Sequence, residues 1–68
     1  MDKITEYLKL LSRVNSNILF LENVLKTVNL SARLHSLLTA DIRELNKDKN
    51  EIKIKIEYQK LNNAIKNI

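Results

Sequence analysis

The residues best suited to chemistry are a single histidine and a few carboxylates near the middle of the chain. His35 is the only imidazole, and as a general base it would need a nucleophile and an orienting group within hydrogen-bonding reach. Ser31, Ser36 and Thr39 are close in sequence, but none of them forms a recognised catalytic arrangement with it. We expect His35 to lie on the surface or at the edge of a bundle. A pH-responsive interface is the one functional interpretation that remains for it.

Asp41 and Glu44 form the most suggestive pair of carboxylates, because an i,i+3 spacing places both on one helix face. Di-metal sites in helical bundles combine such carboxylates with a histidine one turn away, and the chain has none on that face. There is also no cysteine. We therefore expect solvated charges here, with no metal, no cofactor and no enzymatic activity.

The elements that carry these residues are predicted from hydrophobic spacing. Apolar side chains recur in alternating steps of three and four over the first four heptads, which is the pattern of a helix that packs on another helix. These residues are Ile4, Tyr7, Leu11, Val14, Ile18, Leu21, Leu25 and Val28. Asp2 is placed to cap the first turn. The sequence thus predicts a helix over about residues 3–28.

A turn is predicted at residues 29–31. Asn29 is suited to the left-handed conformation that ends many helices, and Ser31 is a good N-cap for the next helix. The heptad phase also fails there, and a new stripe follows in a second helix over about residues 32–67. Its members Leu34, Leu38, Ile42 and Leu45 are predicted to pack against the first helix.

Two features leave the second helix open to alternatives. Residues 46–50 are all polar, and Asp48 with Glu51 resembles a capping box, which would split the helix and give three helices in all. No Gly or Pro enforces a break, so we favour a continuous or mildly bent helix. Residues 51–58 alternate polar and apolar as a half-buried strand does, but Glu51–Lys55 and Lys53–Glu57 have helical i,i+4 spacing. We favour helix.

These patterns predict an all-α fold with a single domain over residues 1–68. The expected architecture is an antiparallel helical hairpin that completes a bundle by oligomerisation or by binding a partner, since 68 residues without disulfides or metal rarely bury enough core alone. Several apolar residues lie outside the seam between the two helices and are the predicted partner or oligomer interface. They are Leu10, Leu19, Phe20, Val24, Ile54, Tyr58, Leu61 and Ile65.

Charge and composition indicate the class of function but not the process. The net charge is +4, yet the lysines are interleaved with acidic residues and there is no aromatic platform for bases, so nucleic-acid binding is a lesser alternative. No stretch suits a membrane span or a signal peptide. We expect a soluble intracellular protein, cytoplasmic by default, that binds itself or a helical protein partner. A regulator from a phage or mobile element that inhibits a target protein is the second alternative.

Overall fold

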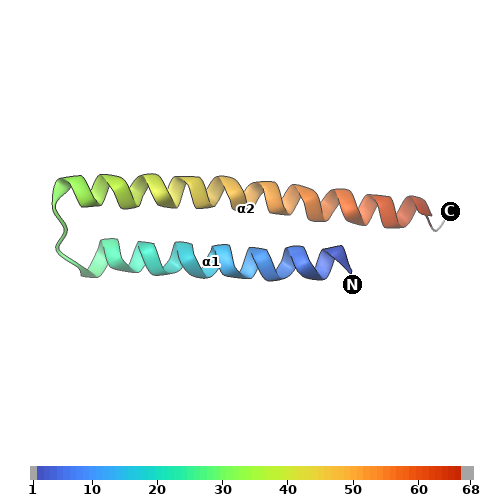
Figure 1. The fold of residues 1–68 in the computed structure, drawn as a ribbon, viewed down its shortest axis with the longest axis horizontal. Coiled ribbons are helices and arrows are strands. Elements are labelled where there is room, and N and C mark those ends of the chain that lie inside the picture. Colours follow the sequence, from blue (N-terminus) through green and yellow to red (C-terminus); the bar gives the residue numbers. More distant parts are fainter. Residues whose placement is uncertain (1, 67–68) are drawn as a thin grey trace.

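The computed structural model describes residues 2–66, which form two α-helices joined by a short turn. Helix α1 spans Lys3–Thr27 and helix α2 spans Ala32–Lys66. The helices lie side by side and run in opposite directions (Figure 1). The predicted all-helical antiparallel hairpin is therefore confirmed. Within the described residues, neither helix has a stretch long and apolar enough to cross a lipid bilayer.

Both predicted N-caps are present. The Asp2 carboxylate accepts a hydrogen bond from the backbone N–H of Ile4 at 3.1 Å, and the hydroxyl of Thr5 donates to it at 3.5 Å. At the start of α2, the backbone N–H of Leu34 donates to the Ser31 hydroxyl oxygen at 3.3 Å. Each cap satisfies an amide that the first helical turn leaves without a partner, so the two side chains fix where the helices begin.

The end of α1 differs from the prediction. The left-handed conformation expected at Asn29 is wrong, because no residue in the described range has a positive φ. The helix ends at Thr27, and Val28 is extended, with φ −104° and ψ 133°. The Val28 N–H still donates to the Val24 carbonyl at 2.9 Å. The connection thus covers residues 28–31 and begins one residue earlier than expected.

Helix α2 is continuous through both ambiguous segments. Residues 46–50 are helical throughout, so the possible third helix does not form, and residues 51–58 are helical instead of extended. Without Gly or Pro, nothing in the polar segment interrupts the i→i−4 hydrogen bonds. The predicted end of this helix, Asn67, lies outside the described residues.

The hairpin is long and thin, with extents of 56 × 16 × 14 Å. Two helices share only one interface, and among the described residues only Ile18 and Ile56 are buried, with 6% and 7% of their surface exposed. All other apolar side chains in this range are half-buried or exposed. The core is therefore a single line of contacts along the hairpin.

We expect Ile18→Ala to lower the free energy of unfolding by about 2–4 kcal/mol, because it removes a buried side chain from a core that has almost no others. The matched control is Leu19→Ala, whose side chain is 66% exposed and whose loss should change stability by less than about 0.5 kcal/mol. Urea denaturation followed by circular dichroism measures both. Equal effects would show that α1 does not pack through the face of Ile18.

Candidate protein-interaction surface

The face of α2 that meets α1 is a heptad stripe, which we call the inner stripe. Its members are half-buried or buried and follow one another in steps of four and three. They are Leu38, Ile42, Leu45, Lys49, Ile52, Ile56 and Gln59. Two of the seven are polar. Lys49 sits in the middle of the stripe, and Gln59 ends it.

On α1, the predicted heptad residues from Ile4 to Leu25 are half-buried, and Ile18 is buried. Two members of the predicted intrachain seam lie differently. Val28 is 49% exposed and Leu34 is 50% exposed. Val28 has left the helix and Leu34 lies in the first turn of α2, so both are at the end of the hairpin that carries the connection.

The inner stripe also contains residues that we did not predict. Ile52 and Ile56 continue the Leu38–Ile42–Leu45 spacing through Lys49. The steps of four and three continue without a break from Leu38 to Ile56 in the sequence. They were not recognised as one stripe because the charged Lys49 interrupts the run of apolar residues. A lysine or asparagine at such a position reduces stability while it restricts register.

The predicted residues at the end of the chain are on the opposite side of α2. We call Ile54, Tyr58, Leu61 and Ile65 the C-terminal apolar stripe. They are 62%, 66%, 55% and 57% exposed. A step of two residues turns an α-helix by about 200°, so Ile54 faces away from α1 where Ile52 and Ile56 face it. This stripe has no partner within the hairpin.

The last two turns of α2 have no cover from α1. Helix α2 extends past the start of α1 (Figure 1), and residues 60–66 are all exposed. On the side that continues the inner stripe, the Gln59 side-chain amide donates to the Asn63 carbonyl oxygen at 3.2 Å. In the middle of α2 the side toward α1 is apolar, whereas in these last turns the same side of the helix is polar. The apolar side of this segment points away from α1.

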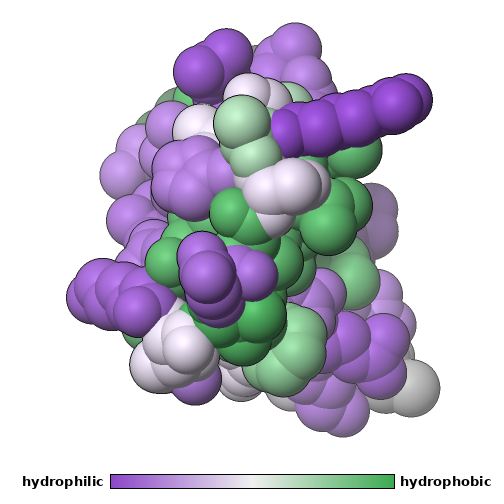
Figure 2. Space-filling model, turned by 90° about the vertical axis from the view of Figure 1, so that its left-hand side faces the viewer, coloured by the Kyte–Doolittle hydropathy of each residue, from purple (hydrophilic) through white to green (hydrophobic). Residues whose placement is uncertain are grey.

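A second group of exposed apolar side chains gathers where the helices are joined. Figure 2 views the hairpin from the end that carries the connection and shows a continuous hydrophobic area there. We call it the loop-end patch, and its exposed members are Val28, Leu34 and Leu37, with Leu37 54% exposed. Leu37 was not among the predicted interface residues.

The predicted interface residues of α1 do not form one surface. Leu10, Leu19 and Phe20 are 45%, 66% and 66% exposed, whereas Val24 is half-buried. Leu8, which was not predicted, is 51% exposed. The heptad positions of Leu10 and Leu19 fall on opposite flanks of α1. A single partner helix therefore does not cover all of them.

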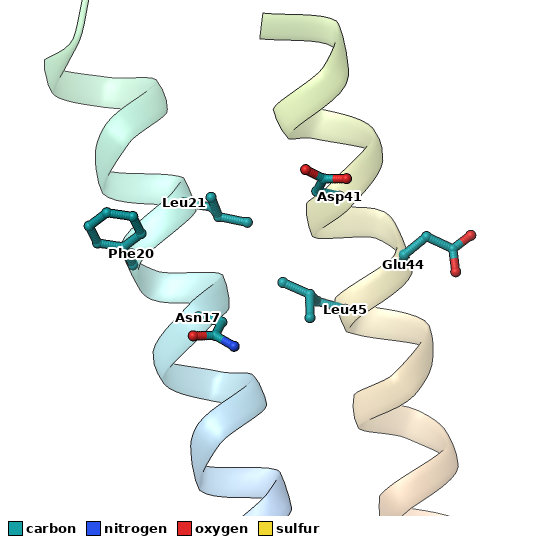
Figure 3. Close-up of a pocket in the computed structure, with 6 residues that line it drawn as sticks. All are labelled: Asn17, Phe20, Leu21, Asp41, Glu44 and Leu45. Carbon is teal, nitrogen blue, oxygen red and sulfur yellow. The ribbon is translucent and has the colours of Figure 1, made fainter. Parts of the chain in front are cut away.

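Phe20 contributes to an open groove of about 340 Å³ between the helices. Leu21 and Leu45 point toward each other across it, and Asn17 and Phe20 lie along its α1 side (Figure 3). Asp41 and Glu44 line the α2 side, where Glu44 points outward. The groove has an apolar floor and an acidic rim, which suits a basic or amphipathic side chain better than a small neutral ligand.

The residues considered for chemistry fall into two separate groups, with Asp41 and Glu44 at the groove and the residues around His35 elsewhere on α2. His35 lines a shallow hollow on α2 with Ser36, Thr39 and Arg43, and the Thr39 hydroxyl donates to the backbone carbonyl of His35 at 2.8 Å, not to its ring. Within residues 2–66, no group of three His, Cys, Asp or Glu side chains is placed to hold a metal ion. The described surface thus offers apolar faces for binding and no assembled site for chemistry.

No family model, no curated protein and no solved structure matches this chain.

We expect Lys49→Leu to raise the free energy of unfolding by about 1 kcal/mol, because it replaces a half-buried charge in the inner stripe with an apolar side chain. Lys53→Leu is the matched control, since Lys53 is exposed on the same helix. Thermal and urea denaturation compare the two. If Lys49→Leu stabilises no more than Lys53→Leu, the inner stripe does not extend through residue 49.

Proposed function

We propose that this chain is a small helical protein–protein interaction module that binds through the faces its own hairpin leaves uncovered. The partner is a second copy or a helical segment of another protein. The observation that carries the proposal is the C-terminal apolar stripe, in which four large apolar side chains, each more than half exposed, follow heptad spacing on the side of α2 away from α1. An exposed stripe with this spacing is suited to a helix.

The free energy available from this stripe is enough for association. Burying its four side chains contributes on the order of 6–12 kcal/mol before the costs of association. Those costs are of similar size, so the stripe supports binding of moderate strength that other contacts reinforce. The hairpin also offers such contacts at the loop-end patch and the groove.

The accessible surface of the hairpin is larger than a chain of its mass ordinarily keeps. It amounts to 5623 Å² for 8.0 kDa, whereas a compact monomer of that mass exposes about 4,450 Å². The difference, about 1,200 Å², exceeds the roughly 800 Å² that each partner buries in a standard interface. A bound partner would bring the exposed surface into the usual range.

Two alternative functions are a regulator that binds a target protein and a nucleic-acid-binding dimer. A regulator that occupies the surface of a target protein would present the same C-terminal apolar stripe, and only the identity of its partner would distinguish it from an assembly subunit. Nucleic-acid binding has less support, because Lys49 is half-buried against α1 and Lys47 and Lys53 lie on different faces of α2. The apolar stripe has no role in that alternative.

We expect Leu61→Asp to abolish association while the chain stays largely helical, because a carboxylate in the middle of the C-terminal apolar stripe cannot be buried without a partner charge. Asn62→Asp is the control, since it adds the same charge at the next exposed position, off the stripe. Light scattering measures the mass, pull-down measures binding to other proteins, and circular dichroism measures the helix content. Unchanged mass together with unchanged pull-down for Leu61→Asp would contradict the proposal.

A further inference from the structure

The exposed face of α2 carries a heptad along its whole length, not only at its C-terminal end. We call this the outer heptad, and every member is exposed. One position is occupied by Leu37, Glu44, Glu51, Tyr58 and Ile65, and the other by Arg33, Ala40, Lys47, Ile54 and Leu61. It lies roughly 150° around the helix from the inner stripe. Helix α2 thus has two helix-packing faces, and α1 covers one of them.

The order of residue types along the outer heptad is informative. After Arg33 at its start, the outer heptad has apolar residues toward both ends, with Leu37 and Ala40 near the connection and the C-terminal apolar stripe at the other end. The centre is charged, with Glu44, Lys47 and Glu51. A face that is apolar at both ends and charged at its centre matches a copy of itself turned end for end.

A parallel pairing of two α2 helices in register is unfavourable. It would place each charged residue of the outer heptad against the same residue of the second copy, which gives repulsive layers at Glu44, Lys47 and Glu51. Arg33 would also meet Arg33. The charges therefore select against the parallel arrangement.

An antiparallel pairing centred on residue 49 brings opposite charges together. Lys47 then lies opposite Glu51 of the second copy, and the twofold symmetry repeats this pair. Beside the heptad, Arg43 comes near Glu57 of the second copy and Asp41 near Lys55. The one like-charged pair is Asp48 with its own symmetry mate. Charge complementarity thus favours this register.

The same register brings apolar residues of the two ends together, although it also places Glu44 opposite Ile54 and Arg33 opposite Ile65. Leu37 of the loop-end patch lies opposite Leu61 of the second copy, and Ala40 lies opposite Tyr58. The overhanging end of α2, which α1 leaves bare, is then covered by the first turns of α2 in the second copy. Leu37 of the loop-end patch and the C-terminal apolar stripe thus cover each other.

We infer that the outer heptad binds a second copy of this chain as an antiparallel, twofold-symmetric α2–α2 pair centred on residue 49. The inference rests on the proposed function and names its partner. The paired segment, residues 33–65, is about 50 Å long. It is long enough to bury the roughly 800 Å² per copy of a standard interface, which the excess surface of the hairpin provides.

Charge reversal at the centre tests the register. The chain should sediment as a dimer, and Lys47→Glu and Glu51→Lys should each weaken dimerisation about tenfold, because each creates two like-charged pairs. The combination of both substitutions should restore the dissociation constant to within about twofold, since it recreates the opposite pairs. Lys60→Glu, on an exposed position away from the outer heptad, is the control for net charge and should have little effect.

Single cysteines test the orientation, because the chain has none of its own. In the antiparallel pair the two copies of residue 40 are roughly 27 Å apart along the helices, whereas residue 40 of one copy meets residue 58 of the other. An equimolar mixture of Ala40→Cys and Tyr58→Cys chains should therefore form a mixed disulfide in a glutathione redox buffer. Each variant alone should remain reduced under the same conditions.

The outcomes separate this inference from the proposed function. A monomer at all concentrations would overturn the inference, while loss of pull-down with Leu61→Asp would still support the interaction module. A dimer in which Ala40→Cys links to itself, or in which the double charge reversal is as weak as the single ones, would overturn the antiparallel register. A dimer that is restored by the double reversal and gives the mixed disulfide would support the inference.

Discussion

The structure depends on one helix–helix interface. A hairpin of two helices buries one stripe on each helix, and within residues 2–66 only Ile18 of α1 and Ile56 of α2 are nearly excluded from solvent. With so little buried apolar area, the folded state has few contacts to offset the entropy of the chain. Any partner that binds the folded hairpin and not the unfolded chain adds directly to its stability. Binding of a partner would therefore be coupled to folding in this protein.

The second helix is longer than that interface requires. At about 1.5 Å per residue, the ten additional residues of α2 relative to α1 add roughly 15 Å. If this length served the hairpin alone, its apolar side would continue the inner stripe. Instead Gln59 and Asn63 hydrogen-bond to each other on that side, and Leu61 and Ile65 lie on the other. The extra length of α2 thus presents its apolar side chains on the side away from α1.

Much of the fold follows from the sequence, because helix α1 has one clear apolar stripe and both caps have the expected residue types. The inner face of α2 was harder to predict. Ile52, Ile54 and Ile56 alternate with charged residues, and on a helix this alternation places apolar side chains on both sides at once. Only the position of α1 decides which side is inner. The turn was mispredicted because an extended Val28 ends the helix without any left-handed residue.

In the proposed dimer, the charged centre of the outer heptad would select one pairing arrangement, while the apolar residues around it would supply affinity. In that dimer, exposed ion pairs such as the one between Lys47 and Glu51 would add little to affinity, so its apolar layers would supply most of the binding free energy. The charges would give specificity because a parallel or shifted pairing separates the opposite charges and brings like charges together. Lys49 has the same effect on the inner face, where a half-buried charge between apolar residues restricts how α1 and α2 slide past each other. Both faces of α2 thus carry charge between apolar residues, an arrangement that lowers stability and restricts register.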